Sequence, residues 1–204
     1  MPDVPGVRLQ LADDVMAVCR LAGSELGQSD PALPYWAFAW AGGLAIARYL
    51  VDHPEEVAGR QVLDVASGSG LCAIVAMRSG ATSAHAVDVD PLSEAAVAVN
   101  ARANGLRVGF SRQDLLGVPP PPCDVILAGD VCYEETMASR MLDWLRLAAG
   151  SGIRVLIGDP GRSYLPSGLE RLATYRVRTS LELEDAEIKQ SAVYTFPSDA
   201  QSSY

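Results

Sequence analysis

The feature that most constrains the fold is the stretch LDVASGSGLCAI at residues 63–74. An apolar, β-branched run meets Gly68 and Gly70, one residue apart, and a second apolar stretch follows. A strand that turns so sharply into a helix is typical of α/β proteins that hold a nucleotide-like ligand, because residues without a Cβ let backbone N–H groups approach the ligand. The turn predicts a ligand site at the carboxyl end of this strand.

The rest of the chain repeats this alternation of strand and helix. β-Branched runs predict five strands, at 61–67, 83–90, 107–114, 123–130 and 153–160. Helical patterns lie at 42–53, 69–80, 91–104 and 135–149, and a short helix is expected after Leu165. Two alternating strands, 175–185 and 187–196, close the chain as a hairpin with an acidic turn. We therefore expect a Rossmann-like α/β fold, with a seven-stranded, mostly parallel sheet, helices on both faces and a C-terminal antiparallel hairpin.

Length and charge limit the number of domains and the class of partner. The 204 residues predict a single domain, 1–204, with an N-terminal helical region at 1–55 and the Rossmann-like core at 56–204. The formal net charge of −9 repels phosphate backbones, so nucleic acid is not expected as a partner.

Cysteine spacing and hydropathy bear on metal binding and location. The four cysteines form no C-x-x-C pair and the chain has only two histidines, so no metal site is expected. No signal peptide is apparent, and the uncharged run at 31–47 is too short to span a membrane. The sequence predicts a soluble, cytoplasmic protein with reduced thiols and no membrane partner.

Two carboxylates distinguish the possible ligands of the glycine turn. Gly68, Gly70 and Ala73 fit the dinucleotide pattern G-x-G-x-x-[GA], and Asp88 ends the next predicted strand, where NAD proteins hold the ribose. Asp64 lies before the glycines, however, and its charge would repel a pyrophosphate. A ligand that carries an ammonium and a sulfonium group would instead be attracted. S-adenosylmethionine is such a ligand.

The segment D64-V-A-S-G-S-G70 resembles motif I of the seven-β-strand (class I) methyltransferases, usually D-x-G-x-G-x-G. Ala66 replaces the first glycine, which indicates that the backbone need not adopt a positive φ there. VDVDP (87–91), QDL (113–115) and GDVCY (129–133) fall at the later motifs of the family. The resemblance implies an S-adenosyl-L-methionine cofactor held by Trp40, Asp64, Ala66, Ser67, Gly68, Gly70, Leu71, Asp88, Val89, Asp114, Leu115 and Gly129.

Two further stretches, 34–50 and 158–166, resemble the lysine methyltransferases that modify the β subunit of the electron transfer flavoprotein, and their bacterial relatives. DVCY (130–133) also fits the D-x-x-Y motif of that lysine-directed group. The resemblance implies that the partner is a protein with exposed lysines, the flavoprotein β subunit in particular. It also implies roles in the reaction for Asp130 and Tyr133. Asp159 and Arg162 follow the fifth predicted strand at the carboxyl edge of the sheet, where substrates dock, so contact with the acceptor is expected, and Trp36 is expected in the core or in the wall of the substrate cleft.

These roles agree with the chemistry of methyl transfer, an in-line displacement that depends on alignment and on exclusion of water. The acceptor amine must be neutral when it reacts. A carboxylate such as Asp130 orients the amine but also favours its charged form, so solvent or a relayed base must take the proton. Trp40 or Tyr133 can stabilise a sulfonium or ammonium cation through cation–π contact.

Three other functions fit parts of the pattern. A small-molecule N-methyltransferase is the nearest alternative, and an enclosed acceptor pocket would favour it. A catalytically silent binding module and an NAD-dependent oxidoreductase are disfavoured, the first by the intact set of site residues and the second because both histidines lie outside the predicted site. Asn100 and Asn104, four residues apart on a predicted helix, are expected to face solvent or to cap the helix.

Overall fold

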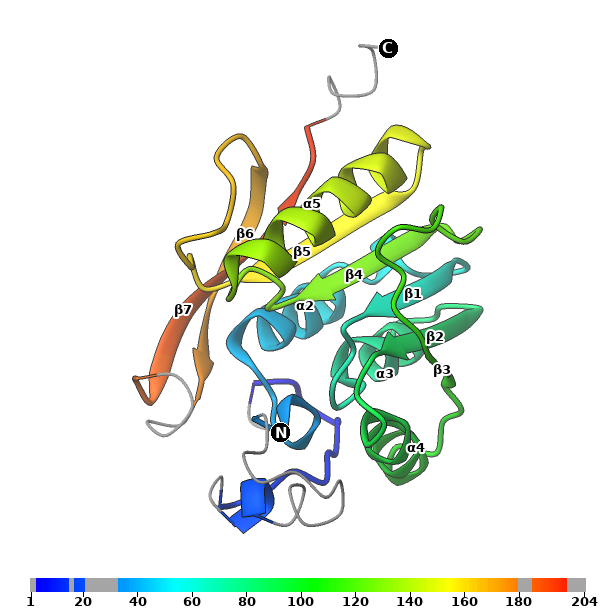
Figure 1. Ribbon diagram of the computed structural model, residues 1–204. Coiled ribbons are helices and arrows are strands. Elements are labelled where there is room, and N and C mark those ends of the chain that lie inside the picture. Colours follow the sequence, from blue (N-terminus) through cyan, green and yellow to red (C-terminus); the bar gives the residue numbers. More distant parts are fainter. Residues whose placement is uncertain (1–2, 15–16, 21–32, 180–184, 198–204) are drawn as a thin grey trace.

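The computed structural model describes residues 3–14, 17–20, 33–179 and 185–197, and it builds one seven-stranded sheet in the order β3-β2-β1-β4-β5-β7-β6 (Figure 1). The strands are β1 (Gln61–Val65), β2 (Ser83–Asp88), β3 (Gly109–Arg112), β4 (Val125–Gly129), β5 (Arg154–Asp159), β6 (Glu170–Arg178) and β7 (Ile188–Thr195). β1 to β5 are parallel, whereas β7 runs antiparallel to both β5 and β6. The predicted fold class is confirmed.

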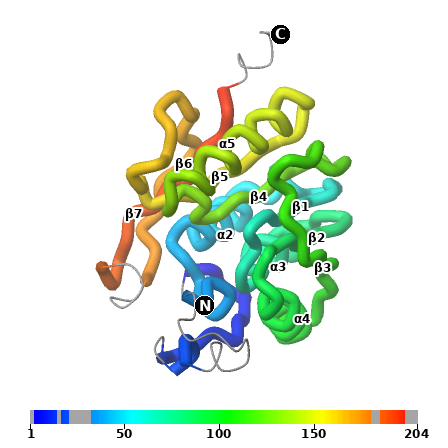
Figure 2. The backbone as a smooth tube through the Cα atoms, viewed as in Figure 1, coloured from blue at the N-terminus to red at the C-terminus, as the bar shows by residue number. Residues whose placement is uncertain are grey.

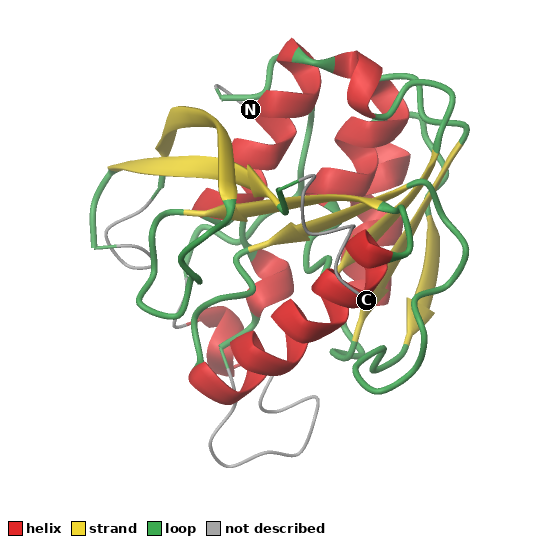
Figure 3. Cartoon of the chain, turned by 90° about the horizontal axis from the view of Figure 1, so that it is seen from above, coloured by secondary structure: helices red, strands yellow, loops and turns green. Residues whose placement is uncertain are grey.

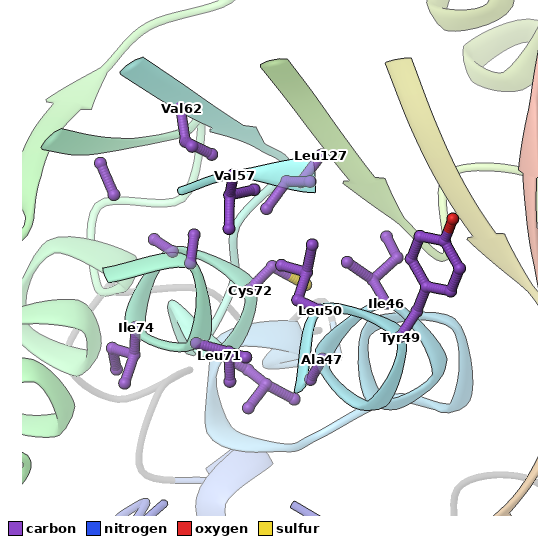
Figure 4. Close-up of a cluster of buried hydrophobic side chains, with 14 of the residues drawn as sticks. Ile46, Ala47, Tyr49, Leu50, Val57, Val62, Leu71, Cys72, Ile74 and Leu127 are labelled. Carbon is purple, nitrogen blue, oxygen red and sulfur yellow. The ribbon is translucent and has the colours of Figure 1, made fainter. Parts of the chain in front are cut away.

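Helices cover both faces of the sheet (Figure 3). One face carries α2 (Ala41–Asp52), α3 (Leu71–Arg78) and α4 (Ser93–Ala103), and the other carries α5 (Glu135–Gly150). Successive strand residues point to opposite faces, so Val125 and Leu127 pack toward α2 and α3 while Ile126 and Ala128 pack toward α5. Figure 4 shows Ile46 and Leu50 of α2 and Leu71 and Ile74 of α3 in the first of these layers.

The N-terminal segment belongs to the same core. Val4 and Val7 are buried in the cluster that contains α2 and α3. Figure 2 shows the segment in blue, running beside the start of α2 toward α4. The described parts of the region 1–55 thus pack on the sheet domain. The single domain over 1–204 stays a prediction.

The start of α2 approaches the sheet so closely that backbone atoms of the two elements are in contact. A Cβ placed on Gly42 would overlap the carbonyl oxygen of Gly158, and a Cβ on Gly158 would overlap that of Gly42. A Cβ on Gly129 would lie 2.9 Å from the backbone of Gly43. No side chain larger than hydrogen fits between these elements. The N-terminus of α2 therefore lies directly against the carboxyl ends of β4 and β5.

The end of the chain differs from expectation in two places. Residues 163–168 form turns in place of the helix expected after Leu165, and β6 begins at Glu170, five residues before the predicted 175. Pro166 and Gly168 explain the first difference, because neither residue favours a helix interior. The end of the first predicted hairpin strand, 180–184, lies outside the described residues.

No helix in the described part of the chain is long and apolar enough to span a membrane.

Candidate active site

A cavity of about 740 Å³ opens at the carboxyl edge of the parallel strands, a size in the usual range for small-molecule sites. Its walls come from the glycine turn, the ends of β2 and β4, and the segment 33–40 before α2. Most residues singled out from the sequence line it: Trp36, Trp40, Asp64, Ala66, Ser67, Gly68, Leu71, Asp88, Val89, Asp114, Leu115, Gly129, Asp130, Tyr133 and Arg162. Gly70 and Asp159 do not line it.

The glycine turn is built from left-handed backbone. Ala66, Gly68 and Gly70 have φ values of 51°, 49° and 78°. The prediction that Ala66 needs no positive φ was therefore wrong. The cost of a Cβ in this conformation is about 1–2 kcal/mol, and the surrounding hydrogen bonds maintain it, since the Ser67 N–H donates to the Val87 carbonyl and the Gly70 N–H donates to that of Ser67.

Gly70 supports the turn from behind. A Cβ on Gly70 would lie 2.9 Å from Val97 of α4. The glycine therefore serves helix packing, in addition to its left-handed backbone.

Asp64 and Asp88 bring two carboxylates to the turn. Asp64 is buried, and its Oδ2 accepts a hydrogen bond of 2.9 Å from the Ala73 N–H. Burial raises the pKa of Asp64 to about 8. The hydrogen bond from Ala73 acts to lower this pKa, and the charge of Asp88 acts to raise it further. Asp88 accepts from the N–H groups of Gly68 and Asp90, at 2.8 and 2.9 Å, and burial raises its pKa as well. A cationic ligand would relieve this concentration of negative charge.

Three buried polar atoms around the cavity have no hydrogen-bond partner among the described residues: Trp36 Nε1, Ser67 Oγ and Ser93 Oγ. Unsatisfied buried polar groups are costly. Two hydroxyls, an indole N–H and the two carboxylates together suit a ligand that is polar, capable of hydrogen bonding in several directions and positively charged at one end.

Aromatic rings form one wall of the cavity. Tyr35 stacks on Tyr133 with ring centroids 5.1 Å apart, and Trp40 lies 5.4 Å from Tyr35 on the other side. The indole N–H of Trp40 donates to the Tyr35 carbonyl at 2.9 Å, which fixes the ring. The pKa of Tyr133 is raised to about 12, mainly by burial and further by the charge and hydroxyl of the neighbouring Tyr35. At neutral pH the phenol is therefore protonated and does not act as a base.

Asp130 joins the end of β4 to α2. Its backbone is left-handed, with φ 59°. Its Oδ2 accepts a hydrogen bond of 2.7 Å from the Gly43 N–H at the start of α2, where the helix dipole favours a negative charge. Its Oδ1 accepts one of 2.6 Å from Arg162 Nη1. Burial raises the pKa of Asp130, although the Arg162 guanidinium in contact with it acts in the opposite direction.

Asp159 lies behind Arg162. It is completely buried, and its Oδ1 accepts 2.7 Å hydrogen bonds from the N–H groups of Gly161 and Arg162. Its Oδ2 lies 3.6 Å from Arg162 Nη1. Asp159 was expected to contact the acceptor directly, but it shapes the loop and holds Arg162, which does reach the cavity.

Comparison with known proteins identifies the family. The family model of ribosomal protein L11 methyltransferase (PrmA) matches residues 49–130. The electron transfer flavoprotein beta subunit lysine methyltransferase of Xenopus laevis is 38% identical over 170 residues, which cover 80% of this chain and 69% of that protein. The protein of that name from Rattus norvegicus is also 38% identical, over 80% of this chain and 67% of its own length. The chain belongs to this family of lysine methyltransferases.

Solved structures agree with a methyltransferase fold. A putative RNA methyltransferase from Pyrococcus horikoshii has a TM-score of 0.60 at 13% identity, covering 87% of this chain and 94% of that one. A ribosomal protein L11 methylase from Lactobacillus delbrueckii has a TM-score of 0.53 at 22% identity, covering 78% and 81%. The predicted family is confirmed. This member is an S-adenosylmethionine-dependent methyltransferase, and the polar, negatively charged cavity fits that cofactor.

One residue beside the glycine turn of this lysine methyltransferase was misjudged from the sequence. Asn100 was expected to face solvent or cap a helix, but it is completely buried. Its Oδ1 accepts from the Gln10 N–H at 2.6 Å, and its Nδ2 donates to the carbonyl of Ser69 in the glycine turn at 2.9 Å. Asn104 holds the same N-terminal segment through the N–H and carbonyl of Arg8, at 3.0 and 2.6 Å.

The spacing of these asparagines was the available signal, since residues four apart share one face of a helix. That the N-terminal segment lies along this face cannot be inferred from local periodicity.

No group of three or more His, Cys, Asp or Glu side chains in the described ranges could hold a metal ion.

Proposed function

We propose that this enzyme transfers methyl groups from S-adenosylmethionine to lysines of an electron transfer flavoprotein β subunit. One observation carries the proposal: the chain is 38% identical, over 80% of its own length and 69% of the relative's, to a protein whose name states that substrate. The human protein of the same name is 36% identical over 170 residues. A protein acceptor also fits the exposed aromatic side chains of Tyr35 and Tyr133 at the cavity and of Tyr164 in the loop after Arg162.

For the cofactor, we assign the amino acid portion to Asp64 and the turn formed by Ala66, Ser67, Gly68 and Gly70, with Leu71 beginning the helix behind it. Asp64 and the aromatic wall at Trp40 suit the ammonium and sulfonium charges. Asp88 suits the ribose hydroxyls, because its carboxylate ends a strand at the cavity.

The adenine is assigned to Val89, Asp114 and Leu115, which line the cavity beyond Asp88. Gly129, at the end of β4, also lines the cavity and is assigned to the cofactor side. S-adenosylmethionine supplies an activated methyl group, and the protein contributes orientation of the acceptor amine and exclusion of water.

On the acceptor side, Asp130 and Arg162 carry the main roles. A carboxylate oxygen accepts more than one hydrogen bond, so Asp130 receives the lysine amine while Arg162 and Gly43 hold its position. Trp36 and Tyr133 line the path of the lysine side chain. Since Tyr133 stays protonated, the proton of the amine leaves to solvent.

We also propose a cytoplasmic protein that binds no nucleic acid. The four cysteines are unpaired, which agrees with a reducing compartment, and the net charge of −9 disfavours phosphate backbones.

The test uses the purified chain, radiolabelled S-adenosylmethionine and the purified electron transfer flavoprotein. We expect label on lysines of the β subunit, and labelling about 100-fold slower when Asp130→Asn replaces the wild type. Calorimetry with S-adenosylhomocysteine shows whether each variant still binds its cofactor product. An unlabelled β subunit, with a competent cofactor site, would refute the proposed acceptor.

A further inference from the structure

The composition of the chain leaves few amines that a lysine-directed enzyme could methylate in itself. Of its 16 basic residues, only Lys189 is a lysine and the others are arginines. A guanidinium is planar and remains charged at any physiological pH, so it is not the neutral amine that a lysine-directed site accepts. Apart from the α-amino group, the chain therefore carries one amine that this enzyme can methylate.

Lys189 lines the same cavity as Asp130, Tyr133 and the predicted cofactor residues. Its side chain is 26% exposed, and Nζ lies 2.8 Å from Asp185 Oδ1. Asp185 also lines the cavity and is itself 84% exposed. Ion pairs with such an exposed partner are weak and open readily.

Sheet register explains how a residue of the last strand reaches the site. Asp159, the last residue of β5, pairs with Ala192 of β7, and β7 runs in the opposite direction. Lys189 therefore lies three residues past the carboxyl end of β5, roughly 10 Å farther along the strand axis. Figure 1 shows the start of β7 (orange) extending beyond the ends of the central strands.

The alternation of side chains along β7 shows on which face of the sheet Lys189 lies. Lys189, Ser191 and Val193 share one side of β7, and Val193 packs in the cluster that contains α2. The amine therefore points to the side of the sheet on which α2 and the aromatic segment 33–40 lie. Arg162, in the loop after β5, lines the cavity between this strand and Asp130.

We propose that Lys189 is a site of intramolecular self-methylation, an inference that rests on the proposed function. The pair with Asp185 opens and the ammonium loses a proton to solvent. The Nζ lone pair then forms a bond to the methyl carbon as the sulfur–methyl bond breaks, with both electrons staying on sulfur. The products are N-methyl-lysine and S-adenosylhomocysteine. Methylation preserves the positive charge, so it changes the shape of the cavity wall and not its field.

Mass spectrometry of the protein as isolated from cells, followed by peptide mapping, is the first measurement. We expect a population heavier by whole methyl groups at Lys189, and none in Lys189→Arg, which keeps the charge. Purified protein is then incubated with labelled S-adenosylmethionine over a tenfold range of enzyme concentration. The labelled fraction should rise at the same rate at every concentration, because the reaction is intramolecular.

The electron transfer flavoprotein, assayed in parallel, separates the possible failures. Label on its β subunit with none on Lys189 would overturn this inference and leave the proposed function intact. Label on neither protein would overturn both. Label that persists in Lys189→Arg, or a rate that scales with enzyme concentration, would also refute intramolecular methylation of Lys189.

Discussion

The cavity has two halves, a cofactor half around the glycine turn and an acceptor half at the ends of β4 and β5, and they differ in the partners of their polar side chains. Around the glycine turn, Trp36 Nε1, Ser67 Oγ and Ser93 Oγ have no described hydrogen-bond partner, and Asp64 and Asp88 accept bonds only from backbone N–H groups among the described contacts. At the ends of β4 and β5, charged side chains instead pair with one another: Asp130 pairs with Arg162, and Arg162 lies 3.6 Å from Asp159 Oδ2, an oxygen that accepts no hydrogen bond from the described residues.

The difference shows how each half meets its ligand. The cofactor half has donors and acceptors available before the ligand arrives, so binding completes it. The acceptor half already pairs its charged side chains with one another, and an incoming amine must share Asp130 with Arg162. Buried ion pairs that lose one partner are strongly destabilised, so the acceptor half should be the more sensitive to substitution.

The largest effect is expected from Gly42→Ala, which breaks the support of the acceptor half. The added Cβ would overlap the Gly158 carbonyl, so α2 must shift, at a cost of about 3 kcal/mol in unfolding free energy. Gly43→Ala is the matched control, since its Cβ would have only ordinary contacts at 3.8 Å and beyond. Urea denaturation measures both variants. Equal stabilities would show that the close contact is not a constraint.

Asp130→Asn is expected to have the next largest effect. The amide keeps the shape but loses the charge that holds Arg162 and the acceptor amine, so turnover should fall by about 100-fold, as expected when reacting groups are misplaced by about 1 Å. Affinity for S-adenosylhomocysteine should change by less than about threefold, because the cofactor half is intact. Steady-state labelling and calorimetry measure the two quantities. A loss confined to cofactor affinity would show that Asp130 belongs to the cofactor half and contradict its proposed role.

Cofactor affinity should depend on pH through Asp64. Its pKa of about 8 means that the carboxyl is mostly protonated at pH 6, and a cationic ligand favours the ionised form. Affinity for S-adenosylhomocysteine should therefore rise by about tenfold from pH 6 to pH 8, with release of a proton on binding. Calorimetry in buffers of different ionisation enthalpy measures this, and Asp64→Asn should abolish the dependence. A flat profile in the wild type would contradict the assignment.

The same group affects stability with the opposite sign. The pKa of Asp64 is raised in the folded state from the ordinary value of 3.8. The folded protein then binds the proton more tightly than the unfolded chain. The ligand-free enzyme should lose stability as pH rises from about 4 to about 8.

The smallest effect is expected from Asn100→Leu. It leaves the Gln10 N–H and the Ser69 carbonyl without a partner, which should cost about 1–2 kcal/mol of stability and weaken S-adenosylhomocysteine binding through the glycine turn. Asn104→Leu removes contacts to Arg8 and to the Asn100 carbonyl but none to the glycine turn, so it serves as the control. If the two variants bound the cofactor product equally well, Asn100 would have no part in positioning the turn.

The sequence predicted what depends on local pattern. β-Branched runs and glycine positions located β1, the turn and the strand ends, so Asp64 and Asp88 were placed correctly at the sheet edge. The left-handed backbone of Ala66 was missed because an alanine gives no sign of positive φ. The position of Asn100 and the burial of Asp159 were missed because both depend on segments that are distant in the chain.

The contact between Gly42 and Gly158 has a consequence for how this enzyme can change over time. Most core contacts join two side chains, so a larger residue on one side can be offset by a smaller one on the other. Here the facing atoms are carbonyl groups that every amino acid carries. No second substitution can restore the fit after the first. The joint between α2 and β5 therefore permits no compensating pair of mutations, and its two positions must stay glycine independently of each other.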